Sequence, residues 1–168
     1  EIDYTTVENA TDDIDKYVNY LSNTINDFRN FYKTDKSMEI TTLNELVEKS
    51  LNIIENSILS NNIKILKELN SSSKIETYIS EVTQVILSLL QNAEDILLEK
   101  QINNPTINIK TYEDYKTIYL EITDNGGGIS NDILGKIFEP YFSTKHEKNG
   151  TGLGLYFAKR IIDNNCNG

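Results

Sequence analysis

The first part of the chain carries a narrow apolar stripe at helical spacing. The stripe advances by alternating steps of three and four residues, and the residues between its members are nearly all polar: Tyr4, Val7, Thr11, Ile14, Val18, Leu21, Ile25, Phe28 and Tyr32. This is the heptad spacing of a helix that packs against another helix. A helix lying on the core of its own domain is the alternative. We expect a coiled-coil-like helix within residues 1–36, followed by a polar linker over Lys33 to Glu39 and a folded domain over 37–168.

A second helix is predicted where the folded domain begins. Thr42 and Glu45 have the spacing of a capping box, in which the hydroxyl and the carboxylate each satisfy a free backbone amide. The positions that follow form one amphipathic face, made of Leu43, Leu46, Val47, Ser50, Leu51, Ile54 and Ile58. The pair Asn61 and Asn62 interrupts this pattern, so we expect the helix to end there.

Strands and one long helix are predicted in the middle of the chain. Alternation in IKILKEL predicts a short strand, the SSS run predicts a turn, and a second strand is expected around Ile75 to Ile79. Ser80 is expected to cap a helix whose apolar face runs from Val82 to Leu97. TINIKTY and TIYLEIT then alternate on either side of EDYK, which predicts an antiparallel hairpin.

A last helix is expected from about Gly152 to Asn164. Helices and strands do not alternate with the regular spacing of a parallel, doubly wound sheet. The fold class predicted is therefore α+β, a two-layer sandwich with helices on one face of a mixed sheet.

Composition narrows the functions that such a domain can have. The 168 residues suffice for one domain with a sizeable core. A formal net charge of -10 argues against nucleic acid as a partner, because phosphate backbones are bound mainly through Lys and Arg. With Cys166 as its one cysteine the chain forms no internal disulfide, and a reducing compartment is the simpler assumption. We expect a cytoplasmic domain, with membrane contact only through other parts of a longer parent protein.

The stretch DNGGGIS, from Asp124 to Ser130, is the first candidate for chemistry. Asp124 ends a predicted strand, so its carboxylate projects from a rigid element and can accept a hydrogen bond from an exocyclic amine or hold a cation. Gly126 and Gly128 allow a flat ligand to approach the backbone closely. An ordinary glycine turn after a strand is the alternative. The GxGxxG and GxxxxGK[ST] loops are both absent from the sequence.

The second candidate is GTGLGL, from Gly150 to Leu155, which leads directly into the last predicted helix. Free amides at a helix N-terminus, assisted by the helix dipole, suit a phosphate group. Lys145 lies just upstream and supplies positive charge to an otherwise acidic domain. His146, the one histidine, is expected to be a solvated loop residue, because its neighbours in the sequence offer no catalytic or metal partners.

A polar stripe on the long helix is the third candidate. Ser88, Asn92 and Asp95 follow one another at i, i+4 and i+7 beside a strongly apolar face. An Asn amide oxygen is a suitable ligand for Mg²⁺, which takes few protein ligands and keeps water and phosphate oxygens as the rest. A solvent-facing polar edge is the alternative.

The order of these pieces resembles a known family. QVILSLLQNAEDIL, DNGGGIS, IFEPYFSTK and GTGLGL are similar to the N, G1, F and G2 boxes of sensor histidine kinases, within the wider gyrase, chaperone, kinase and mismatch-repair ATPase superfamily. The resemblance covers about Thr42 to Gly168 and implies the Bergerat ATP-binding fold. LSNTINDFRNFYK is similar to the second helix of that family's dimerisation and phosphotransfer hairpin.

The resemblance implies ATP and Mg²⁺ as ligands. It implies that Asn92 binds Mg²⁺, that Asp124 accepts the adenine amine, and that Phe138 and Phe142 anchor the base of a nucleotide lid. The whole implied nucleotide site comprises Asn92, Asp95, Asp124, Gly126, Gly128, Lys145, Gly150, Thr151, Gly152, Leu153 and Gly154. The partners implied are a second copy of the chain, through the N-terminal helix, and the receiver domain of a response regulator.

The sequence also departs from the family pattern. Ser88 stands where the family often has a second Asn, and the phosphoacceptor His of the first hairpin helix is expected to lie outside this chain, as are further C-terminal strands. We therefore expect a histidine protein kinase fragment that donates phosphate to a histidine elsewhere and does not phosphorylate itself. A nucleotide-binding interaction module without phosphotransfer is the alternative.

Overall fold

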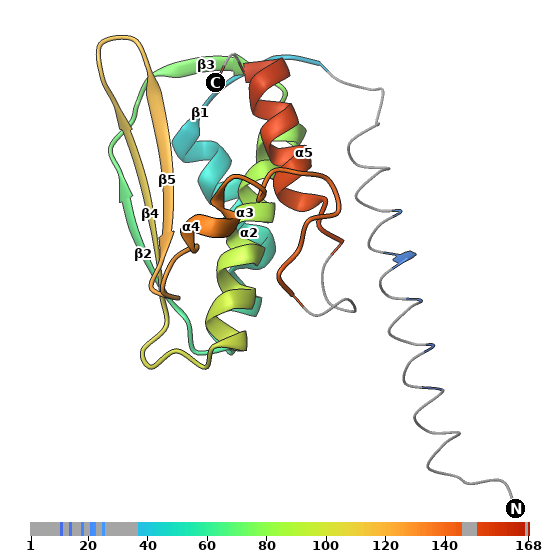
Figure 1. Ribbon diagram of the computed structural model, residues 1–168. Helices are drawn as coiled ribbons and strands as arrows, with labels where there is room; N and C mark the ends of the chain where they lie inside the picture. Colours follow the sequence, from blue (N-terminus) through green and yellow to red (C-terminus); the bar gives the residue numbers. More distant parts are fainter. Residues whose placement is uncertain are drawn as a thin grey trace, which may run out of the picture.

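In a computed structural model of the chain, the described residues are 37–145, 151–166 and 168, with six positions nearer the N-terminus (Figure 1). These six are Thr11, Ile14, Val18, Leu21, Ser22 and Ile25, and all of them are helical and exposed. Four members of the predicted heptad stripe, Tyr4, Val7, Phe28 and Tyr32, lie outside the described residues. The pairing of this helix therefore stays a prediction.

The elements of the folded domain follow the predicted order closely. They are β1 (Glu39–Thr42), α2 (Leu43–Ser60), β2 (Lys64–Leu69), β3 (Lys74–Thr77), α3 (Ile79–Glu99), β4 (Thr106–Glu113), β5 (Ile118–Asp124), α4 (Asn131–Leu134) and α5 (Gly154–Ile161), with a π-helical turn at Ile162–Cys166. Among the described residues, no helix is both long enough and apolar enough to cross a membrane.

The main sheet has the strand order β2-β4-β5, and α2 and α3 cover one of its faces (Figure 1). β2 pairs with β4 in parallel, and β4 pairs with β5 antiparallel, so the sheet is mixed as predicted. A separate two-stranded sheet joins β1 to β3. This arrangement confirms the α+β class and the two-layer architecture.

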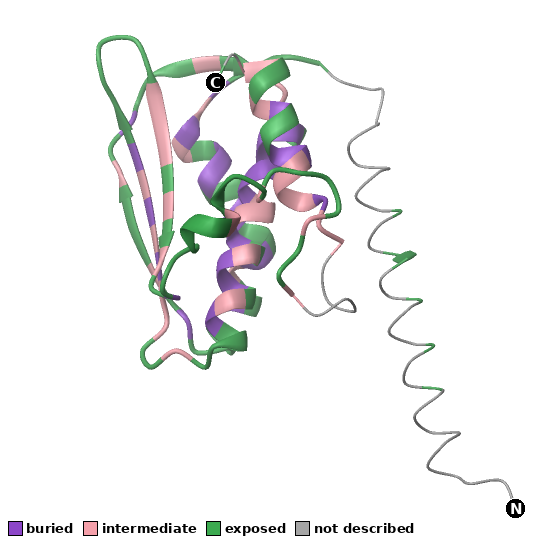
Figure 2. Cartoon of the chain, in the orientation of Figure 1, coloured by how far each residue is buried: buried purple, intermediate pink, exposed green. Residues whose placement is uncertain are grey.

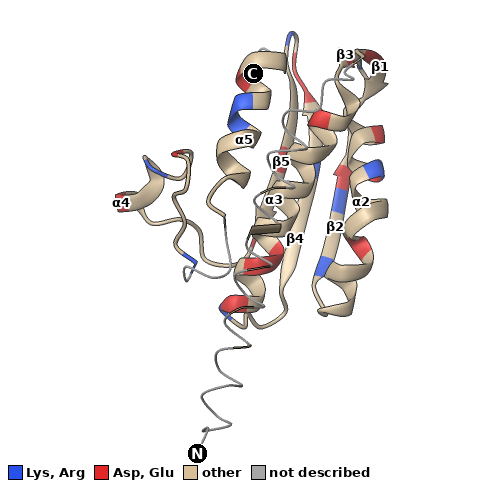
Figure 3. Ribbon diagram, turned by 90° about the vertical axis from the view of Figure 1, so that its right-hand side faces the viewer, with Lys and Arg blue, Asp and Glu red and all other residues tan. Residues whose placement is uncertain are grey.

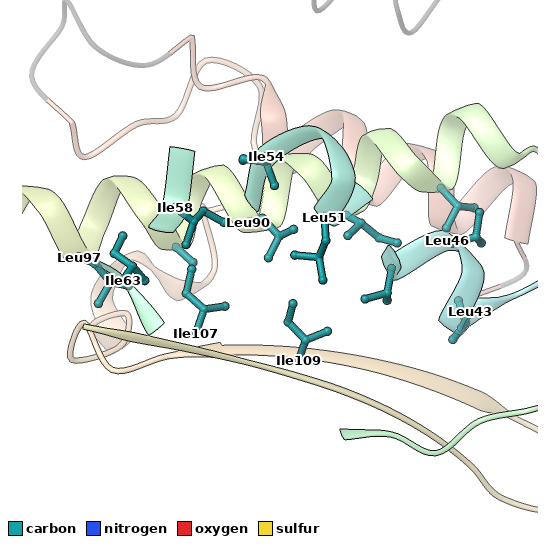
Figure 4. Packing of buried hydrophobic residues seen from close by; sticks show 14 residues of the cluster. Leu43, Leu46, Leu51, Ile54, Ile58, Ile63, Leu90, Leu97, Ile107 and Ile109 are labelled. Atoms are coloured by element: carbon teal, nitrogen blue, oxygen red, sulfur yellow. The ribbon is translucent and has the colours of Figure 1, made fainter. Parts of the chain in front are cut away.

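The core lies between the helices and the main sheet. Leu51 of α2, Leu90 of α3 and Ile107 and Ile109 of β4 are each at most 1% exposed, and Figure 4 shows them meeting in this layer. Burying an aliphatic side chain of this size contributes about 1.5–3 kcal/mol. The opposite face of the sheet carries exposed and half-buried residues (Figure 2). The helical layer therefore fixes the end of β5, from which Asp124 projects.

The capping box at the start of α2 is confirmed. The Glu45 amide donates to Thr42 Oγ1 at 3.2 Å, and the Thr42 amide donates to Glu45 Oε2 at 3.0 Å. The Thr41 hydroxyl also donates to Glu45 Oε2, at 2.7 Å. These donors, the Thr41 hydroxyl foremost, lower the pKa of Glu45. The buried positions of α2 are the seven that its apolar pattern predicts.

Two expected element boundaries are wrong. Ser80 does not cap α3, because the helix begins at Ile79 after Tyr78, which makes no side-chain capping hydrogen bond. The strand expected at Ile75 to Ile79 is β3, which ends at Thr77, where it pairs with Glu39 of β1. The ladder with β1 ends at this pair, two residues before the expected end of the strand. It also places Glu39, expected in a linker, in a strand.

The last helix begins two residues later than expected. α5 begins at Gly154, because Gly152 has a φ of 65° and therefore lies in the left-handed region, outside any right-handed helix. At its other end α5 runs into the π-helical turn. Ala158 and Ile161 of α5 pack on Val85 of α3, so the final helix lies on the long helix.

Candidate functional site

A row of side chains along α3 connects the segments that the sequence singles out. Ser88, Asn92, Ile96 and Lys100 follow at intervals of four residues and so lie near one another on the helix surface, Lys100 being the C-cap residue. At 1.5 Å per residue the row extends over about 18 Å of the helix axis. Each of the four contacts the second half of the chain, Ile96 and Lys100 both at Gly126.

The end of β5 meets the Ile96 position. Asp124 Oδ1 accepts a hydrogen bond from the Gly126 amide at 2.7 Å. Gly126 is buried, and a Cβ added to it would lie 3.0 Å from Ile96 Cγ2 and 2.7 Å from Asp124 Oδ1. A side chain at this position is therefore excluded by close approach. Within the described residues, Asp124 Oδ2 receives no hydrogen bond, so this oxygen can still accept one from a ligand.

Lys100, at the end of α3, holds the glycine loop in place, and it was not identified from the sequence. Its ammonium group donates to the Gly126 carbonyl oxygen at 2.7 Å. The same group lies 3.6 Å from the place where a Cβ of Gly127 would stand. The signal that identifies Lys100 is its place at i+8 from Asn92, in the row that also contains Ser88 and Ile96.

Asn92 and Asp95 meet Lys145. The Lys145 ammonium donates to Asp95 Oδ2 at 2.6 Å and to Asn92 Oδ1 at 3.4 Å. The Lys145 side chain is 22% exposed and that of Asp95 is 50% exposed. Two predicted residues of the α3 stripe thus face one cation together, although Asp95 is also exposed to solvent. Their oxygens form a donor set that also suits a hard metal ion.

The GTGLGL segment meets the other end of the row. Gly154 lies so close to Ser88 that an added Cβ would be 2.7 Å from Ser88 Oγ. Leu153 is 1% exposed, and its amide donates to Thr151 Oγ1 at 3.2 Å. The Gly152 carbonyl oxygen accepts a hydrogen bond from the Tyr141 amide at 3.0 Å. The segment is therefore held by two contacts, one with Ser88 of α3 and one with the backbone at Tyr141.

The aromatic residues of IFEPYFSTK lie on the segment between the two glycine clusters. Figure 3 shows α4 and the chain on either side of it standing away from α3. Phe138 is 44% exposed, and the Lys159 ammonium lies 5.6 Å from the centre of its ring. Phe142 is half-buried, and its backbone passes close to Gly152. Phe142 thus lies at the base of this segment, next to the second glycine cluster.

The structure brings most of the predicted site residues to one helix. Gly126 lies at Ile96 and binds Asp124 through its amide, Lys145 lies at Asn92 and Asp95, and Gly154 lies at Ser88, with Thr151, Gly152 and Leu153 leading to it. Gly128, with a φ of 74°, lies on the open side of its loop with nothing within 4 Å of an added Cβ. Gly150 and His146 lie outside the described residues. In the part of the chain that is described, no cluster of three or more His, Cys, Asp or Glu residues is placed to hold a metal.

Known proteins resemble this chain in sequence. The profile of the histidine kinase-, DNA gyrase B- and HSP90-like ATPase family matches residues 77–168. The sensor histidine kinase ZraS of Salmonella typhimurium is 33% identical over 129 residues, which are 76% of this chain and 26% of ZraS. The chain therefore spans about a quarter of the length of such curated relatives.

Solved structures show the same fold. The nucleotide-free catalytic domain of the histidine kinase ThkA superposes with a TM-score of 0.65 at 30% identity, covering 76% of this chain and 80% of that one. ThkA in complex with the response regulator protein TrrA gives a TM-score of 0.71 at 23% identity, covering 97% of this chain and 46% of that one. At this lower identity the likeness concerns the fold alone.

The profile match extends over more than half of the 168 residues and includes α3, both glycine clusters and α5. The chain belongs to the histidine kinase-, DNA gyrase B- and HSP90-like ATPase family. Within that family it carries the ATP-binding catalytic domain of a sensor histidine kinase.

Proposed function

We propose that this domain binds ATP along the α3 row and donates the γ-phosphate to a histidine that lies outside the present sequence. The observation that carries this proposal is that three segments meet one helix. Gly126, whose amide binds Asp124, lies at Ile96, Lys145 lies at Asn92 and Asp95, and Gly154 lies at Ser88. The carboxylate of Asp124 for the adenine base, the ammonium group of Lys145 for the phosphates and the backbone at Gly154 thus follow one another along α3.

Asp124 is the residue proposed to recognise adenine. Its Oδ1 atom is engaged by the Gly126 amide, which fixes the carboxylate plane. Its Oδ2 atom is the acceptor proposed for the exocyclic amine of adenine. A base that presents a carbonyl oxygen at that place would face a carboxylate without a hydrogen bond, and leaving a buried acceptor unpaired costs about 1–3 kcal/mol. This supports a preference for ATP over GTP.

The phosphates are proposed to lie toward Lys145 and the GTGLGL backbone. Asn92 Oδ1, with Asp95 Oδ2 beside it, would hold a Mg²⁺ ion, which neutralises phosphate charge in phosphoryl transfer. The ammonium group that these two oxygens face supports the proposal that the donor set accepts a cation. The phosphates would lie at the start of α5, whose first-turn amides lack intrahelical partners.

The proposed reaction is a phosphoryl transfer in which an acceptor histidine nitrogen forms a bond to the γ-phosphorus while the bond to the β,γ-bridging oxygen breaks and ADP leaves. The chain contributes by positioning the donor, since such reactions depend on alignment and charge neutralisation. No residue of the described part is proposed to become covalently modified.

A transfer assay tests the proposal. The protein is mixed with γ-labelled ATP, Mg²⁺ and a separately purified dimerisation and phosphotransfer hairpin from a histidine kinase of this type. Label should appear on the supplied hairpin, and Asn92→Ala should abolish the signal. ATP binding without any transfer across several hairpins would instead support a nucleotide-binding interaction module. Label on His146 of this chain would contradict the expectation that its own histidine is no acceptor.

The partners proposed are a second copy of the chain and a response regulator. The described apolar members of the N-terminal stripe, Ile14, Val18, Leu21 and Ile25, are 54% to 64% exposed, which leaves an apolar face for a partner helix. The histidine kinase ThkA is found with its response regulator in a solved complex. A receiver domain as the final phosphate acceptor would place this domain in the cytoplasm.

Sedimentation of the wild-type chain and of Leu21→Asp tests the pairing of the N-terminal helix. The wild-type chain should form a dimer, and the substitution should dissociate it.

A further inference from the structure

Lys145 is held at the point where two oxygen ligands of α3 converge. Its ammonium group lies 2.6 Å from Asp95 Oδ2 and 3.4 Å from Asn92 Oδ1, and its side chain is 22% exposed. A lysine loses much of its rotamer freedom when it is fixed in this way. Something must therefore favour a cation at this point of the helix.

The charge around Asp95 explains why a cation is favoured. Asp95 lies near the C-terminal end of α3, where the helix dipole presents its negative end. Glu99 follows four residues later, and the last turn of α3 contains no basic residue. Lys100, at the C-cap, directs its ammonium group to the Gly126 carbonyl instead. The counter-charge for Asp95 accordingly comes from Lys145, a residue 50 positions further along the chain.

We propose that Lys145 and a divalent cation compete for the same two oxygens, Asn92 Oδ1 and Asp95 Oδ2. This inference rests on the proposed function, in which Asn92 holds Mg²⁺ and Lys145 reaches phosphate. Lys145 cannot reach the phosphate while its ammonium group is bound to Asn92 and Asp95. Entry of the cation displaces the ammonium group from Asp95, and the displaced Lys145 becomes the phosphate ligand. Whether Lys145 contacts Asp95 or phosphate therefore depends on the metal.

The competition predicts that one substitution changes the affinity for the cation alone and the affinity for the metal-nucleotide complex in opposite directions. Removing the ammonium group with Lys145→Met should strengthen the binding of a divalent cation alone, because the cation no longer displaces a counter-ion. The same substitution should weaken the binding of the metal-nucleotide complex, because the phosphate loses a ligand. A lysine that only contributes general positive charge would change the first affinity no more than any other exposed lysine does.

Mn²⁺ alone is the probe, and the concentration of free Mn²⁺ is followed by electron paramagnetic resonance during titration of the full chain. The matched control is Lys136→Met, which makes the same change in net charge at an exposed position on the same segment. Because partly exposed ion pairs are weak, the expected gain of Lys145→Met over Lys136→Met is up to about fivefold. Equal Mn²⁺ affinities of the two variants would overturn the proposal.

A second measurement follows the contact between Lys145 and Asp95 directly and does not depend on nucleotide. Trypsin cleaves after Lys145 only when this side chain leaves Asp95, so Mg²⁺ should accelerate that cleavage. Asp95→Asn should give fast cleavage without metal and abolish the metal effect. Cleavage after Lys116, in the exposed turn between β4 and β5, serves as the internal control and should not change. A rate of cleavage after Lys145 that is independent of Mg²⁺ would contradict the competition.

The two failures can be told apart. If label transfer from ATP proceeds but Mn²⁺ affinity and cleavage ignore Lys145, the competition is wrong and the proposed function stands. If the cation displaces Lys145 but the protein neither binds nor transfers from ATP, the proposed function is wrong, and the two oxygens form a cation site of another kind.

Discussion

The Gly152 carbonyl oxygen accepts a hydrogen bond from the Tyr141 amide at 3.0 Å, and this contact ties the second glycine cluster to the segment that follows α4. The approach leaves no room for a side chain, since a Cβ on Gly152 would lie 2.4 Å from the Tyr141 carbonyl carbon. A left-handed φ of 65° adds a second constraint. Gly152 therefore fixes both the path of the chain and the start of α5.

Gly152→Ala should accordingly destabilise the domain and weaken ATP binding together. The left-handed conformation alone costs an L-residue about 1–2 kcal/mol, and the overlap with Tyr141 adds to that. Urea unfolding should show the loss as a lower midpoint. Gly135→Ala is the matched control, because Gly135 has a φ of -70° and nothing within 4 Å of an added Cβ. Similar midpoints for both variants would contradict the structural assignment of Gly152.

The contact between Gly154 and Ser88 predicts a rescue. Gly154→Ala alone should lower stability by about 1–2 kcal/mol, because the new methyl group overlaps Ser88 Oγ. Adding Ser88→Ala removes that oxygen, and the double variant should regain most of the loss. A coupling energy of about 1 kcal/mol in a double-mutant cycle of unfolding free energies is expected for residues in contact. Strictly additive effects would show that this contact does not limit position 154.

Lys100 should matter for nucleotide binding although no motif contains it. Lys100→Met removes the hydrogen bond to the Gly126 carbonyl and should weaken ATP binding by about fivefold, since one such bond contributes about 1 kcal/mol. Lys110→Met is the control, because Lys110 pairs with Glu68 on the main sheet, away from the α3 row. Isothermal titration of both variants decides the matter. Equal loss in the two would reduce Lys100 to a contributor of general charge.

The acid side of the stability profile should depend on Glu113. Hydroxyl and amide donors from Ser73 and Ser71, the Ser73 hydroxyl foremost, lower the pKa of Glu113 below its ordinary value of 4.5. A carboxyl group whose pKa is lower in the folded state adds stability above its unfolded pKa and loses that stability as the pH falls through its folded pKa. Stability should therefore fall more steeply below about pH 4.5 in the wild type than in Glu113→Gln. Urea midpoints measured across this range that run parallel would contradict the expectation.

Sequence reasoning predicts best where a local pattern decides the structure. The Thr42 and Glu45 cap and the buried face of α2 depend on spacing within one helix, and both are confirmed. The alternating strands of the β4 and β5 hairpin are confirmed for the same reason. The boundary at Ser80 is wrong because pairing between β1 and β3, segments about 35 residues apart, ends the strand and starts the helix.

The candidate site divides in the same way. The glycine clusters and the polar stripe of α3 can be found in the sequence because they follow local rules of backbone freedom and helical spacing. Two contacts of the site depend on how distant segments pack, namely those of Lys145 with Asp95 and of Lys100 with Gly126. No short-range pattern in the sequence predicts them. The common element of these contacts is α3, which carries Asn92, Asp95, Ile96 and Lys100.

The most direct test of the account is a calorimetric titration of ATP, with and without Mg²⁺, into the wild-type chain and Asp124→Asn. An asparagine at this position can still accept from the Gly126 amide, so the loop should keep its shape, but its own amide would point a donor at the adenine amine. The account predicts Mg²⁺-dependent binding to the wild type, and for Asp124→Asn an affinity lower by roughly tenfold or more at unchanged thermal stability. Equal affinity of the two proteins for ATP would contradict the claim that Asp124 and the α3 row form one nucleotide site.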